Sequence, residues 1–152
     1  MCQILRSGFK PPSARNFGGE ILEDVHATLQ EKCKQDLQGQ VVSMVLDGWS
    51  NIHNEPIVCC SVVTQNGESV LVETVDTSGN AHTADYLKEV ATESIKKAEE
   101  RFGVKVRSFV TDNTGNVKKM RSEMAKDNDE ILQYGCSAHL LNLLAHDIQC
   151  TG

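Results

Sequence analysis

The sequence lacks an excess of positive charge. Its 152 residues include 15 Lys and Arg against 21 Asp and Glu, which gives a formal net charge of −6. Domains that bind nucleic acids usually carry a basic face. Any affinity of this chain for DNA must therefore come from a local patch or from regions outside the sequence.

Two local clusters of basic residues are the candidates for such a patch. They consist of Lys96, Lys97, Arg101, Lys105 and Arg107, and of Lys118, Lys119, Arg121 and Lys126. Clusters of charge are usually solvated faces. We therefore predict that both clusters are exposed to solvent, with contact to nucleic acid as the alternative.

Several other features are absent as well. The six cysteines form no paired C-x-x-C pattern, and no apolar segment at the N-terminus could serve as a secretory signal. Reduced thiols in the nucleus or the cytoplasm are therefore expected. No segment approaches the length of a membrane span, so no membrane partner is expected. With 39% hydrophobic residues, the chain is long enough to form one globular domain with its own core.

Apolar periodicity predicts an α/β protein of four helices and five strands. The helices are expected at residues 19–36, 83–102, 115–126 and from 137 onward, and the strands at residues 41–47, 56–64, 69–75, 105–111 and 130–135. Asn66-Gly67 predicts a two-residue hairpin turn. A hairpin followed by alternating strands and helices predicts a mixed sheet with helices on both faces, in which the first and fourth strands are parallel neighbours.

Two aspartates stand where predicted strands end. Asp47 ends the first strand and Asp112 follows the fourth. If those strands are parallel neighbours, both side chains emerge at the same carboxyl edge, where open α/β sheets bind ligands. Two carboxylates repel each other there unless a cation lies between them, and Mg²⁺ or Mn²⁺ suits hard oxygen ligands. Taken singly, Asp47 could belong to a turn with Gly48, and Asp112 could cap the next helix.

Three more residues are candidates for the same region. Trp49 lies just beyond Asp47, where it either packs against the sheet edge or stacks on a nucleic-acid base. Cys136 and His139 stand three residues apart at the start of the last helix. Because a structural zinc site needs four ligands, we favour a buried thiol and a histidine hydrogen-bonded into the core, with metal ligation as the alternative.

Three ordered motifs, "LDGWSN", "TDNTGNVKKM" and "GCSAHLLNLLAHDI", resemble the hAT superfamily of transposases over about residues 5–150. The resemblance implies an RNase H-like mixed five-stranded sheet flanked by helices. It also implies a DDE site in which two divalent ions support the cutting and rejoining of DNA. Asp47 matches the first carboxylate of that site, Asp112 matches the second, and Cys136 with His139 matches the C-x-x-H motif of the family.

The sequence departs from the family pattern at the third acid. In the family this is a glutamate beyond a large helical insertion that follows the C-x-x-H motif, and the sequence stops at Gly152, near where the insertion would begin. The acidic residues Glu123, Glu130 and Asp147 do not match that position. We therefore expect an irregular arm over residues 1–18 and a transposase core over residues 19–152 that is incomplete at its C-terminus.

Three functions remain open. The first is a partial core of a hAT-like DNA transposase, or of a host protein derived from one, inactive alone. It would act in the nucleus and bind Mg²⁺ or Mn²⁺ weakly. DNA binding, and the formation of a homo-oligomer, would depend on missing regions of the full-length protein. The second is a domesticated, non-catalytic module for protein interaction or transcriptional control, which an exposed apolar face from Leu140 to Leu144 would favour. The third is an unrelated metal-dependent nuclease with a complete site, including Asp147, inside this chain.

Overall fold

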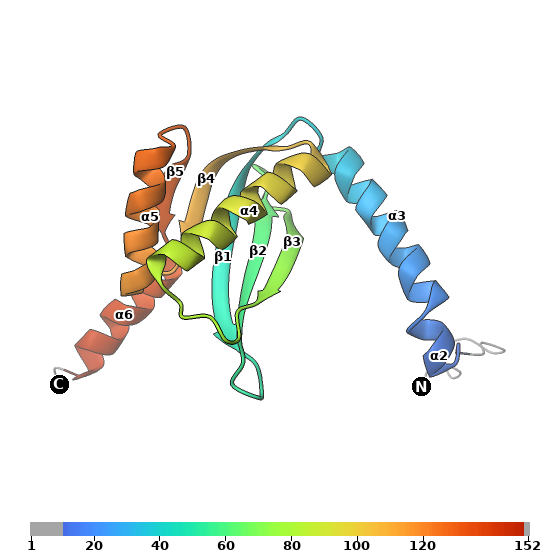
Figure 1. The fold of residues 1–152 in the computed structure, drawn as a ribbon, viewed down its shortest axis with the longest axis horizontal. Coiled ribbons are helices and arrows are strands. Elements are labelled where there is room, and N and C mark those ends of the chain that lie inside the picture. The colour runs from blue at the N-terminus through green and yellow to red at the C-terminus, as the bar shows by residue number, and fades with distance from the viewer. Residues whose placement is uncertain (1–10, 151–152) are drawn as a thin grey trace. The chain divides into compact units, whose positions relative to one another are not determined.

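A computed structural model describes residues 11–150 of the chain. In chain order the elements are α2 (Ala14–Phe17), α3 (Glu20–Leu37), β1 (Val41–Ser50), β2 (Pro56–Val63), β3 (Ser69–Asp76), α4 (Ala84–Phe102), β4 (Lys105–Thr111), α5 (Gly115–Asp127), β5 (Leu132–Gly135) and α6 (Ser137–Cys150) (Figure 1). The chain divides into two compact units, and the boundary in the sequence lies between Asp36 and Leu37.

The first unit contains α2 and nearly all of α3. The side chain of Ser13 caps α2 by accepting a hydrogen bond from the backbone N–H of Asn16. This short helix lies in the segment for which an irregular arm was predicted, and residues 1–10 of that arm lie outside the described part. The apolar positions of α3 fall on the predicted stripe, yet they are largely exposed to solvent; they are Ile21, Leu22, Val25 and Leu29.

The second unit is built on a five-stranded sheet in the order β3-β2-β1-β4-β5. β1 pairs with β2, and β2 with β3, in antiparallel register, whereas β1 with β4 and β4 with β5 are parallel. The predicted mixed sheet flanked by helices is confirmed, and so are the parallel neighbours β1 and β4. Strand order and directions agree with the RNase H-like architecture that the resemblance implied.

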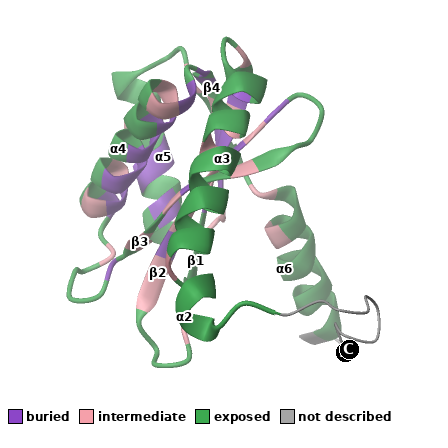
Figure 2. Cartoon of the chain, turned by 90° about the vertical axis from the view of Figure 1, so that its right-hand side faces the viewer, coloured by how far each residue is buried: buried purple, intermediate pink, exposed green. Residues whose placement is uncertain are grey.

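Helices α4 and α5 cover one face of this sheet, with α5 beside β5 (Figure 1). The strand residues that point toward them are buried, among them Met44, Val62 and Phe109, each 0% exposed. The alternating residues on the other face, such as Ser43, Val45 and Ser61, are only half-buried. The well-buried layer is therefore on one face, although the sequence predicted helical cover on both. In Figure 2, buried residues gather on the inner sides of α4 and α5, and α6 is almost wholly exposed.

The capping residues in the sequence predicted both ends of α4 closely. The Thr83 side chain accepts a hydrogen bond from the backbone N–H of Tyr86 at 3.2 Å, and Gly103 closes the helix with a φ of 65°. The β2–β3 hairpin is also confirmed, but its predicted two-residue turn is wrong. Residues 64–68 form the loop, and of Asn66 and Gly67 only the glycine has a positive φ, of 83°.

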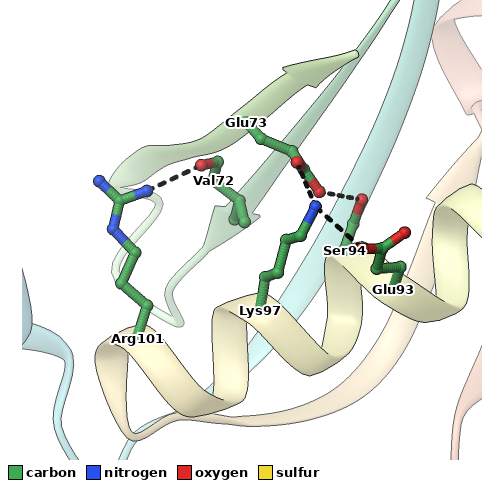
Figure 3. A network of polar contacts seen from close by, with 6 residues as sticks. All are labelled: Val72, Glu73, Glu93, Ser94, Lys97 and Arg101. Atoms are coloured by element: carbon green, nitrogen blue, oxygen red, sulfur yellow. Dashed lines mark hydrogen bonds and ion pairs between the residues drawn. The ribbon is translucent and has the colours of Figure 1, made fainter.

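A polar network attaches α4 to the edge strand β3 (Figure 3). Glu73 accepts hydrogen bonds from the hydroxyl of Ser94 at 2.8 Å and the ammonium of Lys97 at 2.9 Å. The register of β3 against β2 shifts beside Val72, and the carbonyl of Val72 accepts a hydrogen bond from Arg101 at 2.9 Å. Lys97 and Arg101 of the first basic cluster are therefore tied to β3. None of the helices that the structure describes is both long and apolar enough to cross a membrane.

Candidate functional site

Asp47 lies within β1, and Asp112 directly follows the end of the neighbouring strand β4. In the parallel register of β1 and β4, Leu46 pairs with Thr111, and these two residues directly precede the two aspartates. The pairing of β4 stops there, because the chain turns away at Asp112 toward α5. The topology therefore brings the two carboxylate-bearing residues to one place, as the order of elements predicted.

The prediction that the first strand ends at Asp47 was wrong. β1 continues to Ser50, because Asp47 pairs with Cys59, and Trp49 with Ile57, in the antiparallel register with β2. The apolar run stops at Leu46, so apolar periodicity alone could not reveal this extension. The turn between β1 and β2 is formed by residues 51–55, and Asp47 and Gly48 are strand residues.

The carboxylate of Asp47 is exposed and has one local hydrogen bond. Its Oδ1 accepts from the backbone N–H of Gly48 at 3.0 Å. Cys59, its cross-strand neighbour, is half-buried, and burial together with the negative charge of Asp47 raises the pKa of the Cys59 thiol. A neutral thiol therefore stands beside the carboxylate at ordinary pH.

Asp112 is half-buried and orders the turn that enters α5. Its Oδ1 accepts hydrogen bonds from the backbone N–H of Thr114 at 3.1 Å and from the Thr114 hydroxyl at 3.0 Å. Thr114 is the N-cap residue of α5 but makes no capping bond with its own side chain. The expected alternative, in which Asp112 caps the helix, is therefore only partly right, because Asp112 binds the capping residue.

The carboxylates suit a divalent cation in their chemistry. Within the described residues, each aspartate uses only Oδ1 in hydrogen bonds, which leaves Oδ2 of both Asp47 and Asp112 available as a hard oxygen ligand. No three His, Cys, Asp or Glu side chains come together as a metal site between residues 11 and 150. Two of the acids considered as a third ligand are in ion pairs instead, Glu130 with Arg107 at 2.5 Å and Glu123 with Lys119 at 3.7 Å.

A cavity of about 310 Å³ opens beside this edge. Asp112 and Thr114 contribute to its wall together with Trp49, whose side chain is 47% exposed. The remaining wall is mainly apolar, and it includes Leu46, Pro56, Ile57, Val58, Leu87 and Val117. Asp112 thus borders an apolar cavity, whereas Asp47, on the alternate side of β1 from Leu46, is not among the residues that line it.

Sequence reasoning missed Arg121, which it assigned to a solvated basic cluster. Arg121 is 8% exposed, and its guanidinium donates to the Thr111 hydroxyl, to the backbone carbonyl of Asp112 and to Oδ1 of Asn113. A signal for this burial was available in the sequence. Arg121 lies four residues after Val117 and three before Met124, and both of these are buried on the inner face of α5.

Asn113 joins the same network to the start of α6. Its Nδ2 donates to the carbonyl of Cys136 at 3.2 Å, while the backbone N–H of Cys136 donates to the carbonyl of Thr111 at 2.6 Å. Cys136 is half-buried rather than buried as favoured. His139, also half-buried, has no hydrogen bond from its ring among the described residues, so its predicted attachment to the core is not found.

Comparison with known proteins identifies the family of this chain. No curated protein matches the sequence. Residues 12–151 match the family model described as "Domain of unknown function (DUF659)", a domain found in hAT-type transposase-like proteins. Because this match covers nearly the whole chain, the protein belongs to the DUF659 family.

Proposed function

We propose that this chain is the partial catalytic core of a hAT-like DNA transposase, or of a host protein derived from one, and that it acts on DNA in the nucleus. In this proposal Asp47 and Asp112 are two of the three carboxylates of a metal site. Alone, the chain would be inactive. The observation that supports the proposal most directly is the β1–β4 register, in which Leu46 pairs with Thr111 immediately before the two aspartates.

The proposed cofactor is Mg²⁺ or Mn²⁺. Asp47 and Asp112 would hold the ion through carboxylate oxygens, and the bound ion would supply Lewis-acid activation of the oxygen that attacks the DNA phosphate. Two carboxylates without a third protein ligand bind such ions weakly, with a Kd on the order of 1 mM. DNA would be held mainly by other regions of a longer protein, because a chain with a net charge of −6 has little general attraction for phosphates.

Calorimetric titration of the chain with Mn²⁺ tests this proposal. We expect weak saturable binding to the wild type and none to Asp47→Ala or Asp112→Ala, because each substitution removes half of the ligand set. Glu130→Gln is the matched control, since it removes one negative charge from an ion pair at a distant position. Equal heats for the wild type and both aspartate variants would refute the proposed metal site.

A second candidate function is a non-catalytic module for protein interaction, such as one in transcriptional control. The observation that favours it is the exposure of α6, whose large apolar side chains all lie in solvent. They are Leu140, Leu141, Leu143, Leu144 and Ile148, between 44% and 65% exposed. Exposed apolar surface of this kind commonly marks a site of association. In this case the two aspartates would be relics of an enzyme ancestor.

A further inference from the structure

The residue that holds Asp112 in place is not one of the motif residues that the sequence singled out. We infer that Arg121 is a positioning residue for Asp112, and that Asn113 extends the same restraint to Cys136 at the start of α6. The inference rests on the proposed function only in treating Asp112 as a metal ligand. The network itself is defined by the hydrogen bonds of the described residues.

The side chain of Arg121 is buried. A guanidinium that is 8% exposed loses most of its hydration, and this is unfavourable unless its donors are satisfied. Here the acceptors are a hydroxyl, a backbone carbonyl and a side-chain amide, on Thr111, Asp112 and Asn113. In the described part of the chain no ion pair involves Arg121, so hydrogen bonds to this one turn are what stabilise the buried charge.

Arg121 binds the turn by which the chain leaves β4. Thr111 is the last residue of β4, and the chain must leave the sheet through the next three residues before α5 begins at Gly115. Arginine presents several N–H groups in a rigid planar fork, and therefore it can bind three successive residues at once. A lysine ammonium at the same position is a point donor and cannot reproduce this arrangement.

The hydrogen bonds of Asp112 engage only one of its two carboxylate oxygens among the described residues. Arg121 binds the main-chain carbonyl of Asp112, and Thr114 occupies Oδ1 of the carboxylate. Oδ2 is therefore held at the sheet edge without a partner in the described structure, because the turn beneath it is fixed from inside the fold. Such preorganisation of a ligand residue by a neighbouring network is what a weak metal site requires.

Asn113 connects this turn to the start of α6. Asn113 accepts from Arg121 through Oδ1 at 3.0 Å and donates to the Cys136 carbonyl through Nδ2 at 3.2 Å. Both polar atoms of the Asn113 side-chain amide are therefore hydrogen-bonded, Oδ1 to Arg121 of α5 and Nδ2 to Cys136 at the β5–α6 junction. The segments "TDN" and "GCSAH" are held as a single unit, so a disturbance at Arg121 should reach Cys136.

Amide exchange and Mn²⁺-induced line broadening in the NMR spectrum of the whole chain test this inference. In Arg121→Lys we expect exchange at the Thr114 amide to accelerate about tenfold, as loss of one hydrogen bond predicts, with the amide of Phe109 unchanged. We expect the broadening by Mn²⁺ near Asp112 to weaken by a similar factor. Met124→Ala is the control, since it damages the buried face of α5 without touching the turn.

The outcomes are separable. Unchanged Thr114 exchange in Arg121→Lys, or an equal change in Met124→Ala, would overturn the positioning role. Absence of any broadening at Asp47 and Asp112 in the wild type would refute the proposed metal site, while Thr114 exchange would still decide the role of Arg121. If Arg121→Lys does not fold, Asn113→Ala decides: accelerated exchange at the Cys136 amide supports the link, and unchanged exchange overturns it.

Discussion

At the scale of single residues, Gly135 shows how the absence of one side chain shapes the site. A Cβ at this position would lie 2.0 Å from Oδ1 and 2.9 Å from Cγ of Asn113. The Asn113 side chain cannot move aside freely, because both ends of its amide are hydrogen-bonded. Gly135 therefore leaves space for the side chain of Asn113, which connects the turn after β4 to Cys136 at the start of α6.

We expect Gly135→Ala to lower the free energy of unfolding by about 1–3 kcal/mol, because it displaces Asn113 and leaves buried polar groups unpaired. Chemical denaturation monitored by circular dichroism measures this change. Gly115→Ala is the control, since a Cβ there meets no atom within 4 Å and the residue begins a helix. Equal stability of the wild type and Gly135→Ala would show that Asn113 is not held as described.

The candidate site could be predicted from the sequence as far as its acidic residues and their neighbourhood. Asp47 and Asp112 each follow an apolar segment, and the order of elements was enough to place their strands side by side. Arg121 could not be recognised from its charge, because "VKKMRSEM" is typical of a solvated helix face. Only its spacing from buried apolar neighbours distinguishes it, and this spacing does not reveal which hydrogen-bond acceptors the guanidinium meets in the folded protein.

At the scale of secondary-structure elements, the contact between α4 and β3 depends on charge. Burial alone would raise the pKa of Glu73, but hydrogen bonds from Lys97 and Ser94 outweigh it, so the pKa of Glu73 is lowered overall. A lowered pKa in the folded state means that the carboxylate stabilises the fold above its unfolded pKa. This stabilisation is lost as the pH falls through the lowered, folded-state value.

We expect Glu73→Gln to reduce the free energy of unfolding at neutral pH by about 1 kcal/mol, because a neutral amide replaces the charged acceptor and the pair with Lys97 is partly exposed to solvent. The difference between the variant and the wild type should shrink as the pH falls through the lowered pKa of Glu73 in the folded state, because the wild-type carboxylate then takes up its proton. Denaturation curves measured between neutral and acidic pH check this. Glu100→Gln is the control, because its ion pair with Lys96 is long, at 3.8 Å, and largely exposed; a loss as large as that in Glu73→Gln would contradict our account.

Elements were easier to predict than their pairing. The limits of β4 and the start of α6 at Ser137 match the predicted residues, since both are set by local apolar patterns and adjacent turn residues. β1 was predicted three residues too short, because the stretch from Gly48 to Ser50 is strand only by virtue of its partner β2. Such stabilisation comes from a neighbouring strand, which no local pattern in the sequence encodes.

At the scale of the whole molecule, α6 exposes a row of large apolar side chains, most of them leucines. A protein with a net charge of −6 resists non-specific association, but a face of leucines on one helix can still self-associate by burying apolar area. We expect the wild type to dimerise as its concentration rises, and the double substitution Leu141→Ser/Leu144→Ser to weaken dimerisation at least tenfold.

Sedimentation equilibrium measures this difference. The free energy of unfolding should be nearly unaffected, because the two leucines are 64% and 55% exposed. Leu71→Ser provides the control, since Leu71 is 54% exposed on β3, away from α6. If the wild type remains monomeric at every concentration, the exposed face of α6 does not mediate self-association.

The parallel pairing of β1 with β4 also governs when the site can assemble. Ser43 and Ser108, whose hydroxyls lie 2.5 Å apart across these strands, are separated by 65 positions in the sequence. Contacts between residues so far apart in the sequence form slowly, because ordering the intervening chain costs conformational entropy before the contact contributes any stability. During synthesis, the two aspartates can meet only after β2, β3 and α4, which lie between them in the sequence, have emerged. The proposed cation site therefore cannot assemble before Asp112 has left the ribosome.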